Sequence, residues 1–429
     1  MSNPFFNGMN VFLRILKTKE LRNGLLFMLL CVTVFRIAAH IPVPGIDSSG
    51  LEALLAGNQF LGLLNVFSGG TLKSFSIVAL GVGPYITSSI IFQLLGMIFP
   101  SIEELQQEEQ GRQKINRWTR LLTVPLSFLQ GYSILKLLQQ SSASLGTQIT
   151  FSSMDYLLAM LSMMAGTIFL MWLGELISER KMGNGLSIMI FAGIIASMPS
   201  FVAQSLAATT SADTSNILLF LGLTIVTVVG VVYVSEAVRN IPVQYARGGG
   251  NGSTVNSSLP LRINMGGMIP ILFALSLIVL PPLVAQFFVN ARTEVIAQLA
   301  TSTITLFGNN LFYGAIYFVL VFAFTFFYSS VVFKPEQVAE NLQKQGGFIP
   351  GVRPGEQTAK YLQWVTNRLL LIGALFLGII AVLPVFMQEF TGTQNLVVGG
   401  SSVIIVVSVI VDMVKQIEAQ LTMRSYDHK

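Results

Sequence analysis

Two segments decide the fold: residues 76–95, SIVALGVGPYITSSIIFQLL, and residues 261–280, LRINMGGMIPILFALSLIVL. Each is a membrane-length apolar run with two glycines and a proline near its start, and the two occupy matching places in the two halves of the chain. Glycine and proline weaken the start of a helix. In a bilayer such backbone survives only where it is buried in protein or lines a cavity. Paired interrupted spans in corresponding positions therefore indicate a transport pathway built from an internal repeat.

The composition excludes the soluble and disordered classes. Of the 429 residues, 52% are hydrophobic and 10% are charged, whereas a soluble domain has about 25% charged residues. The 38 glycines suit close helix approach in a membrane. The single cysteine, Cys31, rules out an internal disulfide. No cleavable signal peptide is evident, because the first apolar run lacks a small-residue cleavage site.

Hydropathy predicts about ten spans of about 20 residues, the length that a helix needs to cross a bilayer. We place them at residues 23–41, 75–99, 120–139, 154–173, 185–205, 215–237, 266–287, 309–333, 363–386 and 396–414. Roughly 20 of the 25 Lys and Arg residues fall in alternate loops, all on one side of the membrane. This asymmetry is a strong positive-inside signal, so both termini are expected in the cytoplasm.

The predicted spans divide into two halves, residues 1–206 and residues 207–429, with five spans each. An odd number per half means that the second half enters the membrane inverted relative to the first. The linker at about residues 207–215 is short and polar, so the halves form one unit in the bilayer. The Gly/Ser-rich residues 248–258 are predicted to be a flexible cytoplasmic insert.

A short apolar run, FLGLLNVFSGG at residues 60–70, lies between the first two spans. It is too short to cross the membrane and is predicted to be a re-entrant or interfacial helix. A helix lying on the lipid surface is the alternative for such a run taken alone. Its position directly before a glycine-broken span favours a movable plug in a cavity, with the apolar residues Phe60, Leu63, Leu64, Val66 and Phe67.

Four predicted spans carry a face that combines small polar groups with aliphatic side chains. On the second span, Val82, Ile86, Ser89 and Gln93 fall at spacings of four, three and four, which is one helix face. Similar faces hold Ser187, Ile190, Ile194 and Ser197; Ile269, Leu272 and Ser276; and Ser401, Ile405, Ser408 and Asp412. Around one axis they predict a wet passage with an oily waist, which can close to ions by dewetting. Hydrogen bonding of Ser between packed membrane helices is the alternative.

Several kinds of chemistry are missing from the sequence. Ion-coupled carriers usually keep carboxylates or His in mid-membrane, but Glu175, Glu236 and Asp412 lie near cytoplasmic ends of spans. There is no phosphate loop, no His/Cys metal cluster and no Ser/His/Asp grouping in the membrane. We therefore expect no catalytic residue, metal or cofactor, and any directed transport must draw energy from a partner. A secondary transporter for a small solute is the alternative, since an inverted repeat alone permits it.

Two loops on the positively charged side, at about residues 238–264 and 334–361, are candidates for partner contact. In the second loop, Arg353 lies on a tip stiffened by Gly351 and Pro354, and arginine suits recognition of carboxylate or phosphate. In the first loop, Tyr245 is flanked by Arg239 and Arg247. Ordinary positive-inside loops are the alternative.

The chain resembles the SecY family, the large subunits of the bacterial protein-conducting channel. The motifs that carry the resemblance are IPVPGID, ALGVGPYITSSIIFQLL, GNGLSIMIFAGI, IPVQYAR, LPLRINMGGMIP, KPEQVAENLQKQGGFIPGVRPG and GGSSVIIVVSVIVDMVKQ, in the family's order. The resemblance implies an all-α polytopic membrane protein, with ten transmembrane helices in two inverted five-helix halves. These halves form a clamshell with a central pore and a short re-entrant plug helix. The implied function is to pass unfolded preproteins across the bacterial plasma (inner) membrane and to release signal sequences and transmembrane segments sideways into lipid.

The resemblance also implies residue roles and partners. The implied pore ring is Val82, Ile86, Ile190, Ile194, Leu272 and Ile405; the lateral gate is Gln93, Ser89, Thr123 and Ser276; the docking residues are Arg353, Arg239, Tyr245 and Arg247. The implied partners are the small membrane subunits SecE and SecG, the motor ATPase SecA, the ribosome, signal-bearing preproteins and membrane lipid. Asn240 and Gln113 stand where the family usually has a second basic residue.

Overall fold

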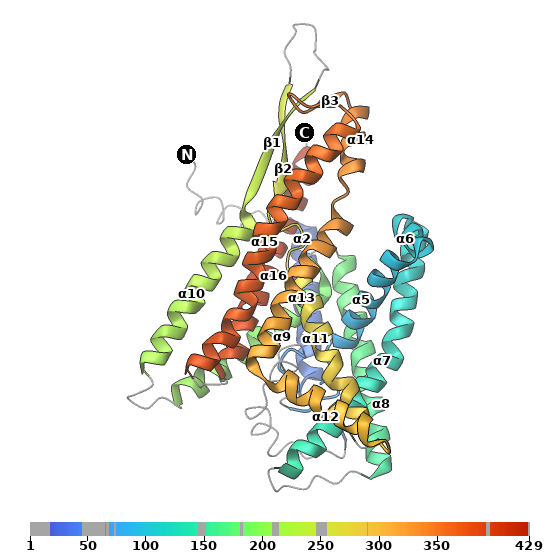
Figure 1. Cartoon of the computed structure of the whole chain (residues 1–429), viewed down its shortest axis with the longest axis vertical. Helices are drawn as coiled ribbons and strands as arrows, with labels where there is room; N and C mark the ends of the chain where they lie inside the picture. The colour runs from blue at the N-terminus through green and yellow to red at the C-terminus, as the bar shows by residue number, and fades with distance from the viewer. Residues whose placement is uncertain are drawn as a thin grey trace.

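Figure 1 shows the computed structural model of the chain, a bundle of helices with a small sheet that projects from one end. The structure describes residues 18–44, 65, 68–72, 74–144, 152–180, 183–207, 214–245, 255–289, 291–391 and 395–427. The helices that overlap the ten predicted spans are α2 (Lys19–Ala38), α5 (Gly83–Ile98), α7 (Glu109–Ser144), α8 (Ser153–Glu179), α9 (Gly185–Ala207), α10 (Thr214–Glu236), α11 (Ile269–Phe288), α13 (Asn310–Val332), α15 (Glu356–Thr391) and α16 (Asn395–Asp427). Three shorter helices, which we did not predict, are α6 (Pro100–Gln107), α12 (Glu294–Gly308) and α14 (Pro335–Lys344).

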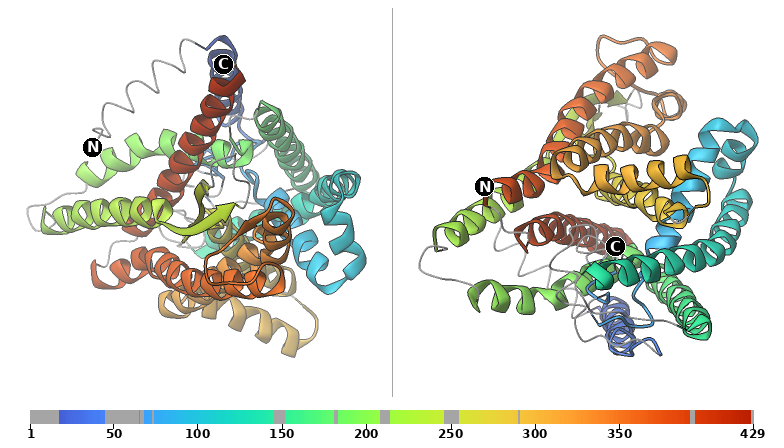
Figure 2. Two further views of the ribbon diagram at one scale, coloured as in Figure 1. Left: turned by 90° about the horizontal axis from the view of Figure 1, so that it is seen from above. Right: turned by 60° about the horizontal axis from the view of Figure 1, so that its bottom comes forward.

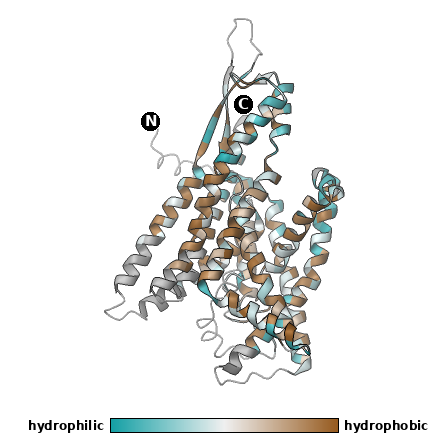
Figure 3. Ribbon diagram, in the orientation of Figure 1, coloured by the Kyte–Doolittle hydropathy of each residue, from teal (hydrophilic) through white to brown (hydrophobic). Residues whose placement is uncertain are grey.

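The helices have the length and hydropathy of a multi-pass membrane protein. Among the described residues, six helices are long and apolar enough to cross a membrane, or up to seven if the bent pair α5 and α6 is one span. The axes of α5 and α6 differ by 118°. Pro100 begins α6, and a residue before proline disfavours the helical conformation, so the bend falls at Phe99. Figure 3 shows apolar residues along the bundle and hydrophilic residues gathered on α14 and α6, while the sheet carries both kinds.

The two interrupted segments begin their helices in the same way. Gly81 and Gly267 both have a backbone φ of +59°, which glycine adopts without steric cost. A proline follows in the first turn of each helix, where its missing N–H is tolerated. The helix of the second span accordingly begins at Gly83 rather than at residue 75, and it has 16 residues. The shared conformation agrees with the interpretation of an internal repeat.

The helices form two groups. Figure 2 shows α11, α13 and α15 on one side of the molecule and α2, α7 and α8 on the other. Within the groups, α13 packs against α11 and α15, and α8 packs against α2 and α7. Between the groups, α11 contacts α5 and α7, while α16 contacts α9. One continuous cluster of buried hydrophobic residues fills the interior across both groups.

We expect Gly166→Ala to destabilise the fold. Gly166 of α8 lies against the non-helical segment before α5, and an added Cβ would lie 2.6 Å from the carbonyl carbon of Ile77 and 3.1 Å from the amide nitrogen of Val78. Because backbone atoms cannot rotate away as a side chain can, we expect the free energy of unfolding to fall by about 1–3 kcal/mol. Thermal unfolding of the purified protein measures the loss. Gly222→Ala in α10 is the matched control, because no heavy atom lies within 4 Å of its added Cβ; equal midpoints for the two variants would contradict the contact.

A three-stranded sheet stands at the end of the bundle, and the expectation of an all-α fold missed it. Strands β1 (Val238–Tyr245), β2 (Val255–Arg262) and β3 (Gly347–Phe348) are antiparallel in the order β2-β1-β3. The prediction of a flexible insert at residues 248–258 was wrong for Val255 to Ser258, because these residues pair with β1. Ile241 and Val243 are buried at alternate positions of β1 over a separate hydrophobic cluster. This alternation is the period of a strand and was readable in the sequence.

Candidate functional site

The six residues predicted for the pore ring are buried in the interior of the bundle. Their exposed fractions lie between 2% and 6%, and all six belong to the continuous hydrophobic cluster. They come from four places: the start of α5 (Val82 and Ile86), α9 (Ile190 and Ile194), α11 (Leu272) and α16 (Ile405). Residues of all four helices belong to one continuous buried apolar cluster, and α5 contacts α11 while α9 contacts α16. We call these six residues the waist.

The predicted plug residues Phe60, Leu63, Leu64, Val66 and Phe67 lie outside the described residues. The residues that follow them are described and are deeply buried, with Thr71 1% and Leu72 0% exposed. Gly69, with φ +71°, lies directly against α9: an added Cβ on Gly69 would be 2.9 Å from the Cα of Gly193. Gly193 directly precedes Ile194. Gly69, near the end of the predicted plug segment, therefore lies against α9 beside the waist residue Ile194, and only glycines permit this approach.

The four predicted gate residues lie on three helices, α5, α7 and α11. On α5, the Gln93 Nε2 donates to the Ser89 Oγ at 3.1 Å, and Gln93 lines a polar pocket with Glu103 of α6 and Lys334. Thr123 of α7 is fully buried, and its hydroxyl donates to the Thr119 carbonyl at 2.7 Å on the same helix. Ser276 of α11 lines a different cavity. The two cavities lie along the seam where α5 and α7 meet the other helix group.

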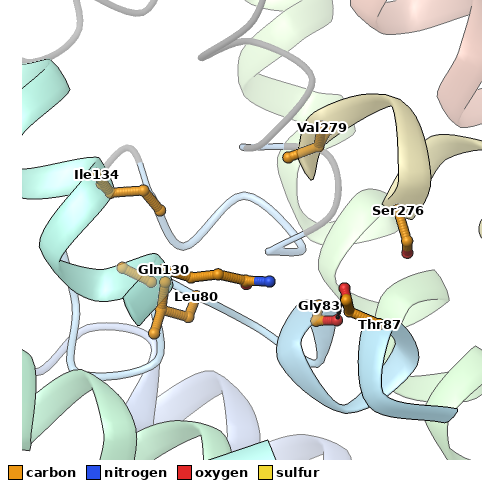
Figure 4. Close-up of a pocket in the computed structure, with 8 residues that line it drawn as sticks. Leu80, Gly83, Thr87, Gln130, Ile134, Ser276 and Val279 are labelled. Carbon is orange, nitrogen blue, oxygen red and sulfur yellow. Dashed lines mark hydrogen bonds between the residues drawn. The ribbon is translucent and has the colours of Figure 1, made fainter. Parts of the chain in front are cut away.

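Sequence reasoning missed two residues at this seam, Gln130 of α7 and Thr87 of α5. Together with Ser276 they surround a cavity of about 30 Å³, and Figure 4 shows the polar ends of the three side chains turned toward it. All three are buried, with Gln130 7%, Thr87 3% and Ser276 6% exposed. The Thr87 hydroxyl donates to the Gly83 carbonyl at 3.1 Å, whereas the Ser276 hydroxyl has no partner among the described residues. A polar cavity of this size can hold a water molecule. An amide in the middle of a predicted span was the available signal for Gln130.

Two further contacts cross the seam. The Ser133 hydroxyl of α7 donates to the Leu283 carbonyl of α11 at 3.1 Å. At the other end of the seam, Lys334 Nζ lies 3.8 Å from a Glu103 carboxylate oxygen, which joins α6 to the start of α14. Each is a single weak link: the first is one hydrogen bond, and the second is a solvent-exposed ion pair of about 0–1 kcal/mol. These two polar contacts add to the apolar packing across the seam, where α11 contacts α5 and α7.

The sheet brings the two predicted docking loops together. Tyr245 of β1 pairs with Gly347 of β3, and its ring packs on that glycine, 2.9 Å from the position of an added Cβ. Arg353 follows on a loop in which Gly351 and Gly355 have positive φ, and its side chain is exposed. The Thr358 hydroxyl donates to the Arg353 carbonyl at 2.9 Å, which holds the backbone of the tip. Arg239 is exposed on β1, and Arg247 lies outside the described residues.

Within the part of the chain that the structure describes, no group of three or more His, Cys, Asp or Glu is placed to hold a metal ion. The fold and the waist together define a class of protein: a multi-pass helical membrane protein whose interior is closed by apolar side chains from both helix groups. The chain belongs to the SecY family, whose profile matches residues 76–414.

Relatives and solved structures agree with this membership. The protein translocase subunit SecY of Streptomyces galbus is 40% identical, over 98% of this chain and 99% of its own length. A SecY structure, described for a plug domain that stabilises the closed state of the translocation channel, has a TM-score of 0.64 at 18% identity and covers 92% of this chain and 91% of its own. Sec61 in the canine ribosome-channel complex has a TM-score of 0.60 at 16% identity, with the same coverage. At these identities the two structures show the fold.

Proposed function

We propose that this chain is the channel subunit of a protein translocase, which passes unfolded preproteins across a membrane and releases signal sequences and transmembrane segments sideways into lipid. The observation that carries the proposal is the buried apolar waist, supplied by four helices, in a chain of the SecY family. A passenger chain has no fixed side-chain chemistry. A passage for it needs a compliant apolar seal and no specific binding groups.

The proposed moving parts are a plug and a lateral gate between two halves. Residues 60–70 would form the plug, because Gly69 and Gly70 at their end lie against α9, next to the waist residue Ile194. Residues 1–206 and 207–429 would form the inverted halves of a clamshell. Its gate would be the seam of α5 and α7 with α11, with Gln93, Ser89, Thr123 and Ser276 as gate residues. We add Gln130 and Thr87, because they line the same cavity as Ser276. A signal sequence is itself an apolar helix, so it can partition through such a seam into lipid.

In this proposal the chain is a passive channel, and a partner supplies the energy. The motor ATPase SecA or the ribosome would dock on the projecting sheet and its loops, at Arg353, Arg239, Tyr245 and Arg247. The joined β1 and β3 support one docking surface, since Tyr245 packs beside the loop that carries Arg353. The canine relative in a ribosome-channel complex supports the ribosome as one of these partners.

The small subunits SecE and SecG are proposed to cover part of the apolar outer surface. Helix α10 exposes Ile225, Val226, Val229 and Tyr233 by 61% to 77%, a face that suits lipid or an apolar partner helix. We place the protein in the bacterial plasma membrane with both termini in the cytoplasm. The distribution of Lys and Arg over alternate loops supports this orientation.

Protease protection in proteoliposomes tests the function. The purified chain with its small partner subunits receives a signal-bearing precursor, SecA and ATP, and the protected precursor is measured. We expect protection that requires both ATP and this chain. Absence of protection, in a complex verified as folded and correctly oriented, would contradict the proposal, and uptake of a small solute without a motor would favour the carrier alternative.

We expect Gln130→Leu, at the seam, to reduce translocation of precursors with weakly apolar signal sequences. An apolar side chain would remove the polar group from the cavity of Thr87 and Ser276 and make the closed seam more apolar. Because one hydrogen-bonding group is worth about 0.5–1.5 kcal/mol, we expect weakly apolar signal sequences to be translocated about threefold less well. Protease protection of precursors with weak and strong signals measures the ratio. Gln363→Leu is the matched control, because the Gln363 amide donates to Asn367 on the exposed face of α15; an equal loss in the control would contradict the role of the cavity.

A further inference from the structure

A groove on the outer surface of the bundle lies beside the proposed gate and is lined by none of the gate residues. It has a volume of about 580 Å³ and lies between α7 and α8, with one wall from the end of α11. We call it the α7–α8 groove; its lining residues are Val124, Pro125, Phe128, Leu129, Tyr132, Met164 and Phe287. Except for the Tyr132 hydroxyl, every one of these side chains is apolar. Such a surface suits a hydrocarbon chain.

One end of the groove leads to aromatic rings and a cation. The Tyr132 ring stacks on Phe287 with centroids 5.0 Å apart and lies 6.2 Å from the Tyr156 ring of α8. Lys136 Nζ lies 5.3 Å from the centroid of Tyr156 and 5.9 Å from that of Tyr132. Gln139 Oε1 accepts from Lys136 Nζ at 3.4 Å and from the Tyr156 hydroxyl at 2.5 Å. These groups hold the ammonium at the mouth of the groove.

The position of Lys136 along α7 matches a membrane surface. At the basic end of α7, Arg120 pairs with Glu175 at 2.7 Å. Lys136 is 16 residues further along, or about 24 Å at the rise of an α-helix, and the hydrocarbon core is about 30 Å thick. Lys136 therefore lies near the opposite interface, where lipid phosphates are found. Among the described residues it has no carboxylate partner.

We propose that the α7–α8 groove binds one anionic phospholipid, with an acyl chain along Phe128, Leu129 and Met164 and the headgroup phosphate on Lys136. The order from apolar lining through tyrosines to a cation is the order of groups along a lipid molecule, and tyrosine is enriched at this depth. A soluble anion would leave the apolar groove unused. A zwitterionic lipid would bring its own cation toward Lys136. Because Phe287 belongs to α11, the bound lipid contacts both sides of the seam.

Native mass spectrometry of the intact complex tests the site. The complex is titrated with phosphatidylglycerol and with phosphatidylcholine that carries the same acyl chains. We expect the wild type to prefer phosphatidylglycerol by about tenfold, which corresponds to about 1.4 kcal/mol. Lys136→Gln should abolish this preference, and Lys136→Arg should retain it. Met164→Trp, which fills the groove, should weaken binding of both lipids.

The matched control is Arg368→Gln. Arg368 lies 3.9 Å from the Trp364 ring centroid on α15, away from the groove, so its loss should leave the preference unchanged. An unchanged preference in Lys136→Gln, or an equal loss in Arg368→Gln, would overturn the proposal. Inorganic phosphate that displaces the lipid at millimolar concentration would overturn it too, because the site would then bind an anion without the acyl chain.

Discussion

Serine at three positions of the waist should make the resting channel leak ions. Ile86, Ile190 and Ile405 are 5%, 2% and 2% exposed and come from α5, α9 and α16. Hydroxyl groups at these positions would let water wet a constriction that apolar side chains keep dry. Each fall of about 1.4 kcal/mol in the barrier to ion entry raises conductance about tenfold. We expect the conductance of the triple variant to exceed that of the wild type by more than this factor. Conductance across planar bilayers, without precursor or motor, is the measurement.

Two sets of variants test whether wetting of the constriction, rather than another change, causes the ion leak. The triple alanine variant leaves a hole of nearly the same size as the serine variant but keeps the surface apolar, so it should leak less. Serine at Ile98, Ile195 and Ile410, which lie on the same three helices and are 68%, 42% and 39% exposed, tests general destabilisation of these helices. Equal leak from the alanine and serine variants would mean that volume alone seals the passage. Unchanged conductance in the serine variant would mean that these residues do not seal the resting channel.

The helices of this fold could be predicted from sequence because a membrane forces each spanning segment to satisfy its own backbone hydrogen bonds. A run of apolar residues therefore predicts a helix even when the segments that pack against it are unknown. The starts of α5 and α11 could also be predicted from neighbouring residues alone. Two glycines and a proline predict a weakened helix start, and Gly81 and Gly267 adopt positive φ there. The bend after α5 is also local, because Pro100 marks it.

The cavity at the seam could not be predicted from the sequence, because the residues that line it meet only in the folded bundle. Thr87, Gln130 and Ser276 come from α5, α7 and α11 and share a cavity, yet no spacing in the chain relates them. The resemblance implied Ser89 and Gln93, which share one helix face, and the structure gives these two a hydrogen bond to each other. The sheet was missed for a different reason. The alternation of buried and exposed residues in β1 was not considered beside the stronger signal of the membrane spans.

Charge reversal at Arg353 should abolish translocation driven by SecA. The Arg353 side chain is exposed, while glycines at 351 and 355 and the bond from Thr358 hold its backbone. The tip therefore presents a guanidinium without further ordering of the loop, which lowers the entropic cost of docking. Removing one partner of a desolvated charge pair costs about 2–5 kcal/mol, which is about 30-fold or more in affinity. We expect Arg353→Glu to lose at least this factor in ATP-dependent protease protection.

Three comparisons assign the loss to docking. Arg353→Lys keeps the charge but not the planar fork, so it should retain part of the activity. Arg117→Glu reverses another exposed cation, on α7 and outside both proposed docking loops, and it should translocate normally. Because an exposed substitution changes stability by about 0.5 kcal/mol at most, Arg353→Glu should also keep the wild-type unfolding midpoint and resting conductance. Normal protease protection in Arg353→Glu would mean that Arg353 is an ordinary basic residue of a cytoplasmic loop. Loss of protection, with the unfolding midpoint and resting conductance unchanged, would mean that only docking of the motor is lost.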